Sequence, residues 1–405
     1  MAWHKVGRRF ATETSRHEPY GNSLSKTPRY RWAYTQPLPS RHVSFLYPFA
    51  LSVLVSLFAN NATAQNASAQ NATAQSPVIH RDICVVIGAE GQPEYGEAFR
   101  AWAKRWQEAF ESKADNKTTR LKLIDGTNKE HANESPSSDH QTQLLEWISQ
   151  TNASQSEQLP QERWLVLIGH GTHDPTQKTS ASKFNLQGPD LTPEMITTAM
   201  SKGAQASDNQ PQTKWIIANC SSCSGPFINA LSGSDRIIIT ATKSGSEQNY
   251  ARFGDYFSRS LSDPKADLDH DKSVSLLEAF LLASDQTASF YESDGRLASE
   301  QSLLDDNGDK RGTPAVFFQG VRPVKAPAEN LKLDGLLAKR TVLYPLPDAT
   351  QLDSTQRTEI EAIENKIETL RGKKKDLPED EYYEQLENLF RDIIKVRRRE
   401  SAKGL

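Results

Sequence analysis

The chain has 405 residues and a formal net charge of −3, a length that accommodates two domains or one domain with appendages. The near-balanced charge argues against a nucleic-acid-binding protein, because no basic stripe dominates the globular part. The chain contains three cysteines, too few for a disulfide framework.

The first 64 residues have the composition of a secretory leader. Residues 1–42 are basic and polar, residues 43–58 are mainly apolar, and Ala62-Thr63-Ala64 offers a cleavage signal. We therefore predict export, to the periplasm or the exterior, although the basic region is long and leaves open a later start. The alternative is an uncleaved signal anchor that attaches the protein to a membrane, but about 16 apolar residues that include Pro48 are short for a span.

A low-complexity repeat follows the leader. Its units are Asn61-Ala-Thr-Ala-Gln, Asn66-Ala-Ser-Ala-Gln and Asn71-Ala-Thr-Ala-Gln. This composition predicts a flexible linker over residues 65–80.

From residue 81 to residue 322, short apolar bursts alternate with segments of helical periodicity. The predicted strands are Ile83–Gly88, Leu121–Ile124, Trp164–Ile168, Trp215–Asn219 and Arg236–Ala241. The predicted helices are Tyr95–Phe110, Gln143–Ile148, Thr192–Met200 and Pro226–Leu231, and polar loops are predicted at His131–His140 and Asn152–Pro160. Strands that alternate with helices predict an α/β domain with a mostly parallel sheet and helices on both faces.

Two of these strands end in residues that can carry chemistry. His170 follows one strand, and Cys220 and Cys223 follow the next strand along the chain. The carboxyl ends of strands in an open α/β sheet line its ligand crevice, so the imidazole and the thiols are expected to meet there. An imidazole beside a thiol can perform nucleophilic acyl transfer. The alternative for each residue alone is structural, namely a packing histidine and small buried cysteines.

The pattern around these strands resembles a known family. The residues that carry the resemblance are His170, Gly171, Ala218, Cys220, Ser224, Gly225, Thr242, Glu247 and Tyr250. Over roughly residues 83–283 they resemble the caspase-like (clan CD) cysteine peptidases and are most similar to the legumain (C13) branch. The resemblance implies a caspase-hemoglobinase fold and a cysteine-type endopeptidase that acts on peptide or protein substrates. It also implies that His170 is the base, that Gly171 lies at a backbone oxyanion hole, and that Thr242, Glu247 and Tyr250 border the specificity pocket.

The position of the nucleophile is ambiguous. The family reads Cys-x-Ser-Gly, whereas the residue three before Gly225 is Ser222. Counting from the end of the strand favours Cys220, and Cys223 is the alternative. The mismatch also allows a catalytically inactive relative that binds partners in the same crevice. Two further alternatives are a disulfide or redox pair in the C-x-x-C motif and a zinc site, for which His173 is the one nearby candidate.

Residues 267–278 match the spacing of a calcium-binding EF-hand loop. The ligand positions are occupied by Asp267, Asp269, Asp271, Ser273 through its carbonyl group, Ser275 and Glu278. Lys272 replaces the glycine that normally makes the sharp turn. We predict a structural calcium ion, and the alternative is an acidic turn that caps the following helix. Asp305–Asp309 form a second acidic turn, which could contribute carboxylates to the same or a neighbouring ion or could be a solvated turn.

The C-terminal part has a different composition. Residues 323–350 are predicted to be a linker, and residues 351–405 a helical hairpin or a coiled coil with a protein partner. The apolar seam predicted for the two helices consists of Ile360, Ile363, Ile367, Leu370, Tyr383, Leu386, Phe390 and Ile393.

Overall fold

The computed structural model describes residues 80–111, 119–127, 139–150, 161–177, 181–205, 213–328, 332–345 and 354–399. The predicted leader over residues 1–64 lies outside the described residues, as do nearly all of the predicted linker over residues 65–80 and most of the two predicted polar loops.

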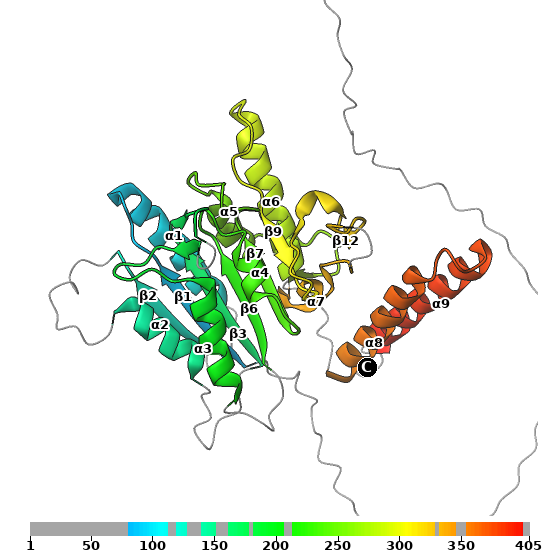
Figure 1. Ribbon diagram of the computed structural model, residues 1–405. Coiled ribbons are helices and arrows are strands. Elements are labelled where there is room, and N and C mark those ends of the chain that lie inside the picture. Colours follow the sequence, from blue (N-terminus) through cyan, green and yellow to red (C-terminus); the bar gives the residue numbers. More distant parts are fainter. Residues whose placement is uncertain are drawn as a thin grey trace, which may run out of the picture. The chain divides into compact units, whose positions relative to one another are not determined.

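A seven-stranded sheet forms the centre of the protein, with the strand order β10-β9-β7-β6-β3-β1-β2 (Figure 1). Its strands are β1 (Arg81–Ile87), β2 (Thr119–Asp125), β3 (Glu162–Ile168), β6 (Lys214–Asn219), β7 (Arg236–Thr240), β9 (Leu303–Asp305) and β10 (Thr313–Pro314). The pairs that join β2, β1, β3, β6 and β7 are parallel, and β9 and β10 add an antiparallel edge. The predicted α/β class with a mostly parallel sheet is confirmed.

Helices cover both faces of this sheet, as predicted (Figure 1). On one face lie α1 (Pro93–Glu111), α5 (Phe253–Ser260) and α6 (Leu276–Ser293), and on the other lie α2 (His140–Ser149), α3 (Pro193–Gln205) and α4 (Phe227–Leu231). Alternate residues of each strand serve the two cores: Ile83 and Val85 of β1 face the α1 side, and Cys84 faces the α2 side. Strands buried on both faces explain why the sequence shows continuous apolar runs.

Short elements that the sequence analysis did not identify complete the domain. They are β4 (Gly171–His173), β5 (Ser182–Phe184), β8 (Ser273–Ser275), β11 (Phe318–Gln319), β12 (Arg322–Pro323), α7 (Leu336–Arg340), β13 (Val342–Pro345) and two 3-10 turns (Pro264–Ala266 and Ala315–Phe317). The segment predicted as a linker over residues 323–350 therefore contains a helix and a strand. β13 pairs with β8, which lies inside the predicted calcium loop, and Leu276 donates to the Thr341 carbonyl at 2.8 Å.

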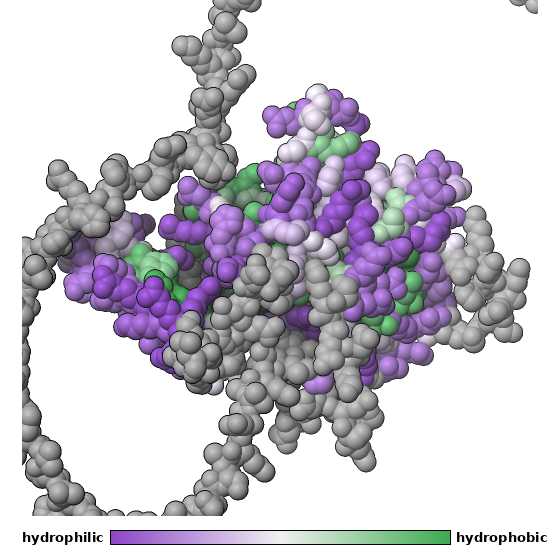
Figure 2. Space-filling view, turned by 180° about the vertical axis from the view of Figure 1, so that it is seen from behind, coloured by the Kyte–Doolittle hydropathy of each residue, from purple (hydrophilic) through white to green (hydrophobic). Residues whose placement is uncertain are grey.

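The C-terminal hairpin is present, as α8 (Ser354–Gly372) and α9 (Glu379–Arg398). Ile360, Ile367 and Leu370 of α8 are buried as predicted. On α9 the buried residues are Tyr382 and Val396, whereas the predicted seam residues Tyr383 and Phe390 are 48% and 45% exposed. Leu386 and Ile393 are half-buried, so the packing face of α9 keeps two of its four predicted residues and differs at Tyr383 and Phe390. Figure 2 shows that the described surface on one side is mainly hydrophilic, with small separate hydrophobic areas.

A buried carboxylate fixes the amino ends of three central strands. Glu162 at the start of β3 is 3% exposed and binds Arg81 of β1 at 2.9 Å and Lys214 of β6 at 2.8 Å. Burial acts to raise the pKa of Glu162, but the two cations outweigh it and lower the pKa from its ordinary 4.5 to about 2. Arg81 also donates to the Val342 carbonyl at 2.8 Å, so the same cluster holds β13.

We predict that Glu162→Gln lowers the free energy of unfolding by about 3 kcal/mol at pH 7, because it leaves the half-buried cations of Arg81 and Lys214 without their buried counter-charge. The folded-state pKa lies below the unfolded one, so this stabilisation is complete above pH 4.5 and is lost as the pH falls towards 2. Urea unfolding of both proteins between pH 7 and pH 3 measures the difference, with exposed Glu97→Gln as the control. Parallel stability profiles for wild type and Glu162→Gln would contradict the prediction.

Candidate active site

His170 lies at the carboxyl edge of the sheet, two residues beyond the end of β3. Its ring stands edge-on to Tyr95 and Phe99 of α1, with centroid separations of 5.0 and 5.1 Å, and lies 6.2 Å from the Tyr250 ring. Tyr250 in turn stacks on Tyr95 at 4.8 Å. His170, Tyr95 and Tyr250 are half-buried, so this aromatic cluster reaches the surface.

The environment of His170 keeps the imidazole neutral. Burial lowers the pKa of His170, and its contact with the Glu90 carbonyl only partly offsets that effect. His170 Nε2 lies 3.3 Å from the Glu90 carbonyl oxygen, which can only accept. The proton therefore belongs on Nε2, and the lone pair of Nδ1 is available as a base.

Cys220 lies in the hydrophobic core. It continues the alternation of Ile216 and Ala218 along β6, and all three side chains face the α1 side of the sheet. It is 1% exposed and packs so closely against α5 that a Cβ on Gly254 would lie 2.8 Å from the Cys220 Cβ. Burial, with a smaller contribution from Glu300, raises the pKa of the Cys220 thiol to about 12. A thiol in this state is not a nucleophile at neutral pH.

Ser222, rather than a cysteine, contacts the residue that follows His170. Its hydroxyl accepts a hydrogen bond from the Gly171 N–H at 3.2 Å and donates to the Gly171 carbonyl at 3.1 Å. The two chains approach so closely that a Cβ on Gly171 would lie 2.1 Å from the Ser222 carbonyl oxygen. Ser222 is also the residue three before Gly225, where the family pattern has its cysteine.

Cys223 has an unusual backbone conformation. Its φ of 56° is in the left-handed region, and its N–H donates to the Glu247 carbonyl at 3.0 Å. The residue is 1% exposed, and burial raises the pKa of its thiol to about 11, although a hydrogen bond with Ser222 acts in the opposite direction. Cys220 and Cys223 are both free thiols, so the structure does not contain the disulfide that the C-x-x-C motif allows.

The residues expected to border the specificity pocket have different roles. Thr242 is fully buried, and its hydroxyl accepts from the Gly225 N–H at 3.1 Å. Glu247 accepts from the N–H groups of Lys243 at 2.8 Å and Gln301 at 3.2 Å, which ties neighbouring loops together. Tyr250 alone lies beside His170, and burial raises its pKa to about 12. Thr242 and Glu247 thus support the loops, and Tyr250 contributes a ring to the aromatic cluster.

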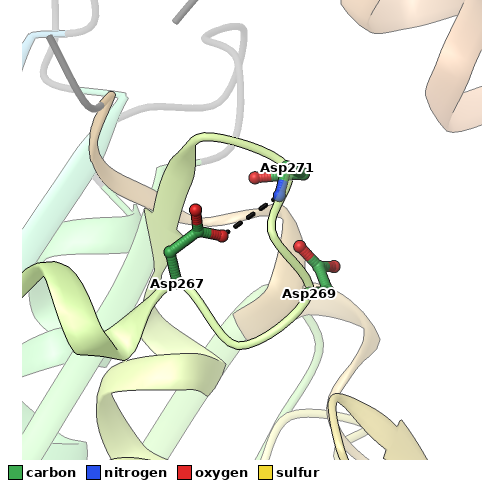
Figure 3. A group of neighbouring side chains, drawn as sticks. All are labelled: Asp267, Asp269 and Asp271. Carbon is green, nitrogen blue, oxygen red and sulfur yellow. Dashed lines mark hydrogen bonds between the residues drawn. The ribbon is translucent and has the colours of Figure 1, made fainter. Parts of the chain in front are cut away.

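The predicted calcium loop brings its first three acidic residues together. One carboxylate oxygen each from Asp267, Asp269 and Asp271 lies within 4.8 Å of the others (Figure 3). Asp267 accepts from the N–H groups of Asp271 at 3.1 Å and Lys272 at 3.2 Å, which curls the loop around its carboxylate. Lys272 adopts a φ of 69°, the left-handed conformation that glycine normally supplies at this position. Lys339 of α7 contributes a cation 3.2 Å from Asp269.

The remaining predicted ligands close the loop onto α6. Ser275 and Glu278 form a capping box, in which Glu278 accepts from the Ser275 N–H at 2.8 Å and the Ser275 hydroxyl receives the Glu278 N–H. The other Glu278 oxygen accepts from the Leu268 N–H at 2.9 Å. Ser273 donates through its N–H and its hydroxyl to Asp271. Burial raises the pKa of Glu278.

Other metal chemistry has little support. The three aspartates are the one group of three metal-ligating side chains found among the described residues. His173, the candidate for a zinc site, hydrogen-bonds through Nδ1 to the Ser182 hydroxyl at 2.8 Å and packs against Gly245.

Sequence reasoning missed the aromatic cluster around His170. The helix Tyr95–Phe110 was predicted from its spacing alone, and nothing in the sequence indicated that Tyr95 and Tyr250 meet across the edge of the sheet. The Glu90 carbonyl was also missed, because it is a main-chain group in a loop. Ser222 was noticed as a mismatch to the family pattern, but its contact with Gly171 depends on the register between β3 and β6.

No protein-family model matches the chain, and no curated protein matches it. Among solved structures, the crystal structure of the Drosophila initiator caspase Dronc is similar with a TM-score of 0.34 and 13% sequence identity, covering 65% of this chain and 96% of that chain. A similarity of this size supports no conclusion about activity. Within the described residues, every helix is too short or too polar to cross a membrane.

We predict that Gly171→Ala disrupts the edge of the sheet beside His170. The new Cβ would collide with the Ser222 carbonyl, so we expect a loss of about 2 kcal/mol or more in the free energy of unfolding. Urea denaturation measures this loss, and Gly372→Ala is the matched control, because an added Cβ there meets nothing within 4 Å. Equal stability of the two variants would show that the two loops are not in close contact.

Proposed function

We propose that this protein is a non-hydrolysing relative of the caspase-type cysteine peptidases, which binds a peptide or protein segment at the carboxyl edge of its sheet. The observation that carries the proposal is the pair of hydrogen bonds between the Ser222 hydroxyl and the Gly171 backbone. In the family pattern, a cysteine occupies this position and the Gly171 N–H stabilises an oxyanion. Here the Ser222 hydroxyl, which is less acidic than a thiol, stands at this position and already accepts the hydrogen bond from the Gly171 N–H.

The state of the thiols supports the same proposal. Acyl transfer requires a thiolate, and reactive cysteines have lowered pKa values and partial exposure. Cys220 and Cys223 have the opposite properties, since both are 1% exposed and burial raises their pKa values to about 12 and about 11. His170 lowers the pKa of neither thiol. The imidazole therefore has no thiolate partner in this arrangement.

The aromatic cluster supports a binding role. Half-buried Tyr95, His170 and Tyr250 present ring edges and faces at one place on the surface. Aromatic side chains that are partly exposed in this way are enriched in recognition sites, because they offer a large apolar area with few conformations to lose. A chain segment with apolar side chains fits this chemistry.

A cysteine endopeptidase that uses Cys223 is the second candidate. The φ of 56° at Cys223 favours it, because non-glycine residues in the left-handed region are concentrated at functional sites. Cys223 also directly follows Ser222, which contacts Gly171.

Thiol chemistry separates the two candidates. Iodoacetamide at pH 7.5 should label the native protein slowly, because Cys220 and Cys223 are each 1% exposed and burial raises their pKa values. His170→Ala should leave this slow rate unchanged, whereas a thiolate activated by His170 would lose about tenfold or more of its labelling rate. Wild-type cleavage of a peptide library that is lost in Cys223→Ala would overturn the non-hydrolysing proposal and establish the peptidase.

We further propose that Asp267–Glu278 binds a structural calcium ion, in line with predicted export to a calcium-containing exterior. Three convergent carboxylates supply the hard oxygens that calcium prefers. Lys339 pairs with Asp269 and Arg397 pairs with Asp271, each at 3.2 Å, and these two cations balance only part of the charge. The loop is remote from His170: β13 pairs with it, and the Arg81 contact to Val342 places β13 at the amino ends of the strands. The ion would hold α6 and β13 together and take no part in chemistry.

We predict that, at a free calcium concentration of 100 times the Kd of this loop, Asp269→Ala removes about 2.7 kcal/mol of the stabilisation that calcium gives the wild type. The readout is the change in melting temperature that calcium causes in each protein. Loss of the Lys339 ion pair with Asp269 lowers the melting temperature with and without calcium alike, so it does not alter this change. Asp285→Ala, at an exposed position on α6, is the control. A melting temperature that is indifferent to calcium in the wild type would refute the proposal.

A further inference from the structure

A second loop repeats the geometry of the first. Residues 305–313 join β9 to β10, and Asp305, Asn307 and Asp309 have the spacing of Asp267, Asp269 and Asp271. The fourth and sixth residues of both loops adopt left-handed conformations, with φ values of 57° and 69° at His270 and Lys272 and of 78° and 67° at Gly308 and Lys310.

The hydrogen bonds inside the two loops also correspond. In each loop the fifth residue accepts from the N–H of the seventh, Asp271 from Ser273 at 2.9 Å and Asp309 from Arg311 at 2.8 Å. The first carboxylate of each loop accepts from N–H groups further along it, and Asp305 accepts from Gly308 at 3.2 Å. The two loops therefore share a backbone conformation and a hydrogen-bond pattern, but these features alone do not indicate a ligand.

The indication of a ligand comes from buried oxygen atoms without partners. Asp305 is 1% exposed, and its Oδ2 is buried and receives no hydrogen bond. Asp309 Oδ2 is buried without a hydrogen bond in the same loop. Among the described residues, no lysine, arginine or histidine forms an ion pair with either carboxylate, whereas Asp269 and Asp271 of the first loop pair with Lys339 and Arg397. Two buried anionic oxygens without a donor or a cation are costly unless a cation binds them.

Neighbouring groups are arranged to complete a coordination shell of oxygens. The Asn307 amide donates to the Lys332 carbonyl at 3.0 Å, which directs its Oδ1 back into the loop. The hydroxyl of Ser232 lies beside the Asp305 carboxylate and accepts from the Lys310 N–H at 3.0 Å. By the spacing of the first loop, the carbonyl group of the seventh residue, Arg311, is the next ligand.

We infer that residues 305–311 form a second calcium site, with Asp305, Asn307 and Asp309 as side-chain ligands. The site is separate from the first, because β9 runs antiparallel to β7 and Gly308 packs against the Gly233 turn that precedes β7. The ion neutralises the two buried carboxylates and fixes the antiparallel edge of the sheet. This inference does not depend on the first loop or on the binding proposal for His170.

Native mass spectrometry of the full chain, freed of metal by chelation and titrated with calcium chloride alone, tests the inference. We expect two bound calcium ions per chain in the wild type and in Asp285→Asn. The double variant Asp305→Asn/Asp309→Asn should bind one ion, and Asp269→Asn/Asp271→Asn should also bind one. The isosteric amides keep the shape of each loop and remove its charge.

The variants keep failure of the two sites distinguishable. If the first loop does not bind calcium, Asp269→Asn/Asp271→Asn will match the wild type while Asp305→Asn/Asp309→Asn still loses one ion, and the second site stands. If Asp305→Asn/Asp309→Asn binds as many ions as the wild type, the second site is refuted. Should that variant fail to fold, the other decides: one ion retained by Asp269→Asn/Asp271→Asn supports the second site, and none retained overturns it.

Discussion

The in-register parallel pairing of β3 with β6 is the constraint on which the candidate site depends. It aligns Leu167 with Asn219, and both chains then leave the sheet at the same edge. Ser222 meets Gly171 as a direct consequence, because each lies a few residues beyond the last paired position. Side chains alternate along a strand, so the same register directs Cys220 into the core. A shift of the register by one residue would separate Ser222 from Gly171 and turn the Cys220 side chain away from the core.

The two edges of the sheet are built for different purposes. At the amino ends, charged groups are buried or half-buried and interact with one another or with rings: Glu162 joins three strands, and Arg163 lies between the rings of Trp147 and Trp215, at 4.3 and 4.6 Å from their centres. At the carboxyl ends, the contacts are mainly between neutral groups, and the rings around His170 are only half-buried. The charged groups at the amino ends fix the strands to one another, whereas the carboxyl ends leave Tyr95, His170 and Tyr250 half-buried.

Local sequence patterns predicted the regular part of the fold well. All five predicted strands and four predicted helices are present, because apolar runs and helical spacing report which faces are buried. The short strands β4, β5 and β8 to β13 were missed, since two to four residues are too few to show a period, and β13 depends on a pairing with residues far away in the chain. Part of the apolar seam of α9 was misplaced because residues 382 and 383 are both tyrosines, and only packing against α8 decides which of the two is buried.

The positions of the candidate residues were predictable, but their surroundings were not. The structure has His170 and Gly171 at the expected edge of the sheet and brings Asp267, Asp269 and Asp271 together, because the spacing within each motif is short and local. Cys220 was favoured by counting from the end of the strand, a rule that ignores the alternation that buries it. Thr242 and Glu247 were assigned to a pocket, but their hydrogen bonds to backbone groups could not be read from a linear pattern.

The pairing of β8 with β13 closes a long excursion of the chain that begins in α6 and returns through α7. Three paired positions connect β13, at the end of this excursion, to β8 at its start, and the Arg81 contact to the Val342 carbonyl adds a further link. Proteolytic cleavage between β12 and α7 would therefore not release the C-terminal fragment. The two fragments would remain associated as a nicked complex, and the C-terminal hairpin would co-purify with the rest of the protein.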